Sequence, residues 1–197
     1  MANTQVQFGF REYATIDGIN PTYGNAIKKI AAGNAVPIFK NDPVTQLSTG
    51  YIAQSVAGTT QIEGIFIGCK YLSASQGRTV YNSYWPGTDA IGDVEAYVIN
   101  NPFHKFVVAS IGGPLVFANV GNNVNFSLVV PGVTATGISG AVIDFATVAV
   151  TATLPFRILG LYSDVAAPGE NGSDNTTTFN WAIVGFNNQT FKSNTGI

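Results

Sequence analysis

Charged residues are scarce in this sequence: 9 Lys and Arg and 11 Asp and Glu make up 10% of its 197 residues. A typical soluble domain has about 25%. High charge is therefore excluded as a cause of disorder. The nine basic residues are dispersed along the chain and the sequence pI is about 5.2, so there is no run of basic residues of the kind that marks nucleic-acid binding. We expect no nucleic acid among the partners.

Cysteine and histidine occur once each, as Cys69 and His104. A single Cys cannot form an intrachain disulfide, and a zinc site needs three or four His, Cys or carboxylate ligands. A lone His before a predicted strand is typical of a surface or capping residue. No Ser lies in a nucleophile elbow, and no glycine-rich phosphate loop precedes a helix. We therefore predict no catalytic residue, no metal site, no cofactor and no enzymatic activity.

Long apolar runs are also missing. Residues 106–143 carry no charge, but Gly, Pro or Asn interrupts them every few residues. A membrane-spanning helix needs about 20 consecutive, mostly apolar residues. The first residues lack the basic and apolar segments of a signal peptide. We expect neither a membrane helix nor a signal peptide.

Strand patterns fill most of the sequence, and the clearest is the segment Ile62 to Gly87. It predicts two strands joined by the polar turn SASQG, because apolar, β-branched and aromatic residues alternate on both sides of that turn. The first of these strands is predicted to have two apolar faces, one with Ile65, Ile67, Cys69 and Tyr71 and the other with Ile62, Gly64 and Phe66. Cys69 is expected to be a small buried hydrophobe.

About ten to twelve short strands, with turn signals roughly every 8–12 residues, predict an all-β fold. We expect residues 35–197 to form a β-rich body, either an antiparallel sandwich or a barrel-like sheet. Residues 1–34 are predicted to form an extended N-terminal arm. This arm includes one short helical turn from Asn25 to Ala32, which ends at Gly33.

The low charge predicts an assembled protein, because the centres of large interfaces are depleted in Lys and Glu. A neutral, polar monomer is the alternative, since such surfaces also occur on monomers. The aromatic arm is the first candidate for a segment that adds a strand to a neighbour's sheet edge, although it could equally pack on its own domain. The candidate contact residues are Phe8, Phe10, Arg11, Tyr13, Tyr84 and Trp85.

Several segments, in their order along the chain, resemble one known family: MANTQVQFGFRE, GIFIGCKY, YNSYWPGT, EAYVINNPFHKFVV, ATLPFRILGL and WAIVGFNNQTFKSNTGI. With them the chain resembles the small head-decoration (cement) proteins of tailed bacteriophages. The resemblance implies a non-enzymatic, β-rich virion protein, made in the bacterial cytoplasm. Such a protein binds the outer surface of the major capsid protein lattice and stabilises the shell. The resemblance also implies a homo-oligomer and favours a trimer over a dimer.

Two other functions are compatible with the sequence. One is a carbohydrate- or receptor-binding β module on a virion or tail, with exposed Tyr81, Tyr84 and Trp85 stacking on sugars. The other is a hydrolase that uses Asp93 and Glu95, which lie two apart on one predicted strand and so share a face. An acidic loop with Asp164, Glu170 and Asp174 is a variant of this second possibility.

Overall fold

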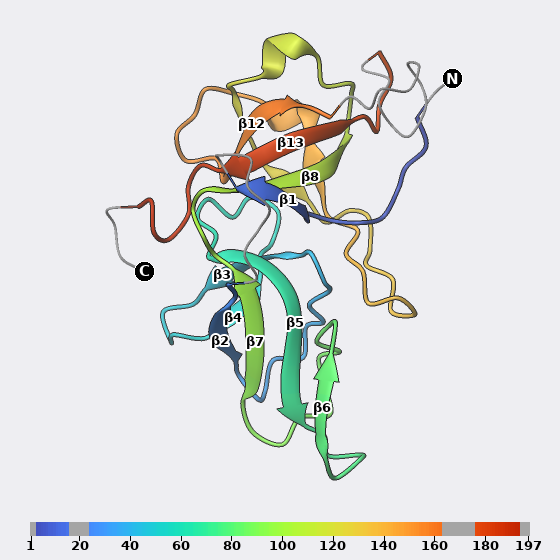
Figure 1. Cartoon of the computed structure of the whole chain (residues 1–197), viewed down its shortest axis with the longest axis vertical. Helices are drawn as coiled ribbons and strands as arrows, with labels where there is room; N and C mark the ends of the chain where they lie inside the picture. Colours follow the sequence, from blue (N-terminus) through green and yellow to red (C-terminus); the bar gives the residue numbers. More distant parts are fainter. Residues whose placement is uncertain (1–2, 16–23, 163–175, 194–197) are drawn as a thin grey trace.

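The computed structural model describes residues 3–15, 24–162 and 176–193, and it is built almost entirely from β-strands (Figure 1). Strands make up 43% of the described residues and helices 4%, whereas an average domain has about 20–25% strand. The helical share comes from two single 3-10 turns, Phe117–Asn119 and Phe145–Thr147. The predicted all-β fold, with a barrel-like sheet, is confirmed.

The first sheet has seven strands and forms the upper half of the molecule in Figure 1. Its path runs β10-β11-β8-β13-β12-β9, and β1 pairs with β8 beside this path. All pairs are antiparallel except β11 with β8. The strands are β1 (Arg11–Thr15), β8 (His104–Ile111), β9 (Asn123–Val124), β10 (Phe126–Ser127), β11 (Val142–Asp144), β12 (Phe156–Leu161) and β13 (Trp181–Phe186).

The second sheet has six strands and forms the lower half, where β5 and β7 run along the long axis (Figure 1). Its path is β2-β7-β5-β3-β4, with β6 paired to β5. The end strands β2 and β4 contact each other, so this sheet curls towards a closed barrel. The strands are β2 (Ala26–Ile30), β3 (Pro43–Gln46), β4 (Ile52–Gln54), β5 (Gly64–Leu72), β6 (Thr79–Asn82) and β7 (Val94–Ile99).

The predicted helical turn from Asn25 to Ala32 is wrong, because this segment contains strand β2. Its five residues pair antiparallel with β7, from Ala26 opposite Val98 to Ile30 opposite Val94. An eight-residue helix is marginal by itself, whereas the sheet supplies backbone partners and buries Ile30 completely. Side chains alternate between the two faces of β2, as they do in a strand.

The predicted hairpin is confirmed: β5 and β6 pair antiparallel around the turn after Leu72. The predicted faces of β5 are only half right, because its register with β7 shifts between Phe66 and Gly68. One extra residue in a strand moves all later side chains to the opposite face. Ile65 and Ile67 therefore pack in one core, whereas Cys69 joins Phe66 in the other.

Two hydrophobic cores result. The first lies in the seven-stranded sheet and includes Phe10, which stacks on Phe156 with 4.3 Å between ring centroids. Ile65 and Ile99, from β5 and β7 of the other sheet, also belong to this first core. The second core lies inside the six-stranded sheet around Trp85. Because β5 and β7 supply side chains to both cores, the two sheets pack as one body.

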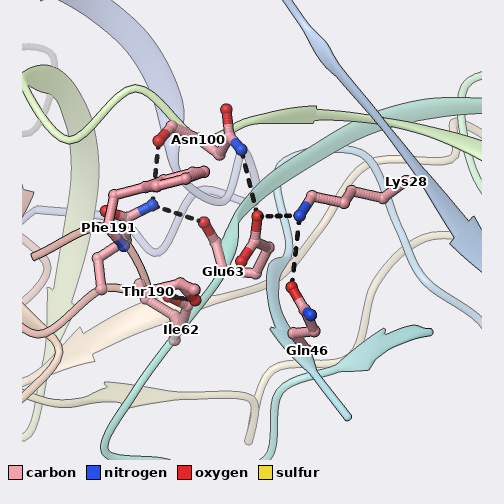
Figure 2. A network of polar contacts seen from close by, with 8 residues as sticks. Lys28, Gln46, Ile62, Glu63, Asn100, Thr190 and Phe191 are labelled. Atoms are coloured by element: carbon pink, nitrogen blue, oxygen red, sulfur yellow. Dashed lines mark hydrogen bonds and ion pairs between the residues drawn. The ribbon is translucent and has the colours of Figure 1, made fainter. Parts of the chain in front are cut away.

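A buried carboxylate lies at the junction of the two sheets (Figure 2). The side chain of Glu63, just before β5, is fully buried, and its Oε1 lies 2.7 Å from Nζ of Lys28 on β2. Lys28 also donates to Gln46 on β3, and Asn100, after β7, donates to Glu63 Oε1. Glu63 Oε2 has no hydrogen-bond partner among the described residues, so Lys28 is the main compensation for this buried charge.

The C-terminal segment joins the same junction. Gln189, which follows β13 of the first sheet, is fully buried, and its Nε2 donates to the backbone carbonyls of Glu63 and Asn100. Thr190 N donates to the carbonyl of Ile62, drawn beside it in Figure 2. The segment after β13 is thereby tied to strands β5 and β7.

Removing Lys28 tests this junction. Lys28→Met should lower the free energy of unfolding at pH 7 by about 3 kcal/mol, because it leaves the buried Glu63 charge without its cation. Lys29→Met, on the exposed face of the same strand, is the matched control. Its Nζ lies 4.0 Å from Asp93 and its side chain is 69% exposed, so it should change stability by less than about 0.5 kcal/mol. Urea unfolding followed by Trp fluorescence measures both; equal effects would contradict the assigned role.

Cys69 is fully buried in the second core, as expected, and burial raises the pKa of its thiol to about 12. A raised pKa keeps the thiol protonated and unreactive. In the folded protein at pH 8, Cys69 should therefore resist a thiol-specific reagent for hours, and it should react within minutes after unfolding in urea. Fast modification of the folded chain would contradict this.

Candidate functional site

The N-terminal arm, the predicted contact segment, packs on its own chain. Strand β1 pairs antiparallel with β8, so the strand addition expected on a neighbour is made within the chain. Phe8 contacts Trp181 edge to face at 5.1 Å between ring centroids, and Tyr13 contacts Tyr162 in the same manner at 6.1 Å. Phe10, also predicted as a contact residue, is covered completely by the first core of its own chain.

The arm and the junction between the sheets enclose a groove of about 540 Å³, which we call the arm groove. Its apolar floor comes from β5, the end of β7 and the loop before β11. Its polar rim comes from the arm and the loop before β3. The lining residues are Phe8, Arg11, Glu12, Lys40, Asn41, Ile67, Ile99 and Ile138.

Gly9 and Asn41 determine how the arm reaches this groove. Gly9 has φ +62°, and a Cβ there would lie 2.6 Å from the Cβ of Ser139 and 2.7 Å from the carbonyl oxygen of Asn41. Asn41 binds the arm on both sides of Gly9: its Nδ2 donates to the carbonyl of Phe8 at 2.8 Å, and its own carbonyl accepts from Phe10 N at 3.0 Å. A side chain at position 9 would push the arm off this loop.

The loop between β10 and β11 supplies Ile138 to the lining of the arm groove. It belongs to the first sheet by sequence, yet Lys40 N donates to the carbonyl of Gly137 and Ser139 N donates to the carbonyl of Lys40. Ser139 Oγ also donates to Asp42, whose carboxyl pKa is raised by burial although Ser139 and neighbouring donors counteract that shift. These contacts hold Ile138 in the lining of the arm groove.

The charges at the rim are of both signs. The guanidinium of Arg11 lies 5.5 Å from the centroid of the Phe8 ring. Glu12 Oε1 lies 2.8 Å from Nε2 of His104, which is 3% exposed. The sequence suggested a surface or capping role for His104. In the structure it is instead buried, and it links β8 to β1 through Glu12. With isoleucines below and Arg11, Glu12 and Lys40 above, the groove can hold an apolar side chain of a peptide and hydrogen-bond its backbone.

Tyr84 and Trp85 lie outside the arm groove. Trp85 is fully buried, and its Nε1 donates to the carbonyl of Asn34. Trp85, also predicted as a contact residue, belongs to the second core, where its ring packs on Tyr71 with 5.3 Å between ring centroids. Tyr84 is half-buried and stacks on Phe39. Of these three aromatic residues, Tyr81 is the most exposed, at 72%, and Nζ of Lys70 lies 6.0 Å from its ring centroid. The proposed sugar platform therefore lacks an exposed Trp85.

The carboxylates proposed for hydrolysis have separate partners. Asp93 accepts a hydrogen bond from Tyr51, which raises the tyrosine's pKa. Glu95 pairs with Lys70 at 3.0 Å, and this lysine lowers the pKa of Glu95. A hollow beside β2 contains Asp93 without Glu95. The acidic loop with Asp164, Glu170 and Asp174 lies outside the described residues.

Within residues 3–15, 24–162 and 176–193, no group of three or more His, Cys, Asp or Glu side chains is placed to hold a metal ion. No helix within these ranges is long and apolar enough to cross a membrane. Searches against protein-family models, curated proteins and solved structures found no match.

Sequence reasoning identified Phe8 and Arg11 of the arm groove and missed Asn41 and Ile138. Asn41 has φ +74° and follows Lys40 in the segment KNDP, so a turn there was predictable. Its bond to an arm 33 residues earlier was not. Ile138 lies in a stretch of small residues that gives no sign of which sheet it contacts.

Gly9→Ala tests how the arm is held. The substitution forces a left-handed backbone on alanine and places its methyl group against Ser139, so it should cost at least about 1–2 kcal/mol. Hydrogen exchange in β1 should accelerate. Gly33→Ala is the control, since nothing lies within 4 Å of its Cβ position. Unchanged protection of β1 in Gly9→Ala would contradict this account.

Proposed function

We propose that this chain is a structural virion protein that coats the outer surface of a tailed-bacteriophage head. In this role it binds the major capsid protein lattice and stabilises the shell as a homo-oligomer, a trimer rather than a dimer. The proposal starts from the ordered resemblance to head-decoration proteins, and one structural observation supports it best: the composition of the exposed surface.

That surface combines low charge with many exposed apolar groups. Sixteen large hydrophobic side chains in the described part of the chain are at least 41% exposed, among them Val150 at 86% and Phe117 at 81%. Single exposed hydrophobic residues are normal, but here only 20 charged residues in the whole chain accompany them. A free monomer with this surface has little charge to keep it from associating.

A lattice turns weak contacts into strong attachment. When one oligomer contacts several neighbouring capsid subunits, the later contacts form at high effective concentration, and overall avidity can exceed a single affinity by about 10²–10⁴. Each chain then needs only a modest contact area. The arm groove and the exposed apolar side chains are the surfaces available for it.

The experiment uses particles of the phage that encodes the chain. Gradient-purified virions should contain the chain at a copy number comparable to that of the major capsid protein, and electron cryomicroscopy should show it outside the head. In sedimentation, the purified chain should have three times its 20.7 kDa mass, because a trimer covers part of the apolar surface.

Two outcomes would contradict the proposal. One is a solitary monomer that does not sediment with the particles. The other is a location on the tail fibres together with saturable glycan binding, which would support the carbohydrate- or receptor-binding alternative.

A further inference from the structure

Basic residues that are dispersed in the sequence gather around one small cavity of about 180 Å³ on the first sheet. Three of the nine Lys and Arg residues line it, and no Asp or Glu among the described residues does. The lining residues are Pro102, Phe103, His104, Lys105, Arg157, Leu159, Gly185, Phe186, Asn187 and Lys192. We call this feature the cationic cavity.

The sheet register creates the cavity. Gly185 on β13 lies directly opposite Lys105 on β8 and Arg157 on β12. The two cations therefore flank a residue without a side chain, one strand away on either side, and adjacent strands are about 4.8 Å apart. Leu159 packs over the space that a side chain at 185 would need, with Cδ1 3.0 Å from the ideal Cβ position.

Two of the cations have no acidic partner among the residues that the structure describes. Arg157 donates from Nε to Oδ1 of Asn123 at 3.0 Å, and Lys192 donates to the carbonyl of Phe186. Neither lies within 4.0 Å of a carboxylate in the part of the chain that the structure describes. Desolvation first, and then the nearby charge of Arg157, lowers the pKa of Lys192. An anion beside these two groups would favour the charged form of Lys192 and reduce its repulsion with Arg157.

The rim of the cationic cavity is apolar. Phe103 is 57% exposed and lies 6.0 Å, centroid to Nζ, from Lys192. Leu159 is 42% exposed, and Phe191, beside Lys192 in the chain, is 62% exposed. Aromatic side chains and Arg are enriched at protein interfaces.

We propose that the cationic cavity binds a carboxylate that has an apolar group next to it, as an acidic segment of a partner protein presents it. The guanidinium of Arg157 and the ammonium of Lys192 contact the two oxygens, and Phe103 and Leu159 cover the apolar group. Nucleic acid fits poorly, because a net charge of −2 repels a polyanion beyond this small site. The inference goes beyond the proposed function, since it concerns an acidic ligand whether or not that ligand belongs to a shell.

The test uses 3-phenylpropionate as the probe, with the ¹⁵N-labelled full chain observed by NMR. It should cause saturable shifts at residues 103, 157 and 192, with a dissociation constant on the order of 1 mM. Its amide, 3-phenylpropionamide, has the same apolar body without the charge and should bind at least about tenfold more weakly. Inorganic phosphate, which has charge without an apolar body, should also bind more weakly.

Substitutions localise the effect. Arg157→Gln and Lys192→Gln should each weaken 3-phenylpropionate at least about tenfold, while Arg78→Gln, at an exposed position before β6, should leave it unchanged. The amide spectrum of each variant reports whether it is folded. Absence of saturable shifts in the wild-type chain, equal binding of the amide, or tighter binding of phosphate would each overturn the proposal. Because no particle is involved, these outcomes are independent of the proposed virion role.

Discussion

The structure depends on one buried charge. Glu63 lies where the two sheets meet, fully excluded from solvent, and an isolated carboxylate in such a place costs several kcal/mol. Lys28 from β2 provides the compensating charge, while Asn100 and Gln189 bring β7 and the segment after β13 to the same point. A buried ion pair is weak evidence for stability as such. Its consequence here is geometric, because the charge is satisfied only when β2 and the end of β7 have come together beside the start of β5.

The same coupling appears in the apolar cores. The register shift in β5 turns Ile65 towards the first core and Cys69 towards the second, so one strand supports both. The N-terminal arm completes the first core with Phe10. An arm whose central ring is covered in this way is part of the folded body, and its outward residues, such as Arg11 and Tyr13, are the ones left to meet a partner.

Local pattern was enough to predict much of this fold. Alternation along Gly64–Leu72 predicted β5, and the polar turn after it predicted the hairpin. The segment Asn25–Ala32 was wrongly predicted as a helical turn, because Ala, Lys and Ile are acceptable in a helix. Its pairing with β7 is what makes it a strand. The burial of Phe10 and Trp85, the shift in β5 and the arm groove all come from contacts between residues far apart in sequence. No local pattern encodes them.

In a chain with so few charges, the partner of each charge is informative. Lys28 pairs with Glu63, Lys70 pairs with Glu95, and Lys29 lies near Asp93. All three lysines therefore neutralise carboxylates in or next to the second sheet. Arg157 and Lys192 line the same cavity with an apolar rim, and in the described part of the chain no carboxylate lies within 4.0 Å of either. Two like charges held close together reduce the stability of the folded chain unless an anion binds there. The apolar surface of the chain argues for association in general, and this pair of cations adds the chemistry that a partner must offer.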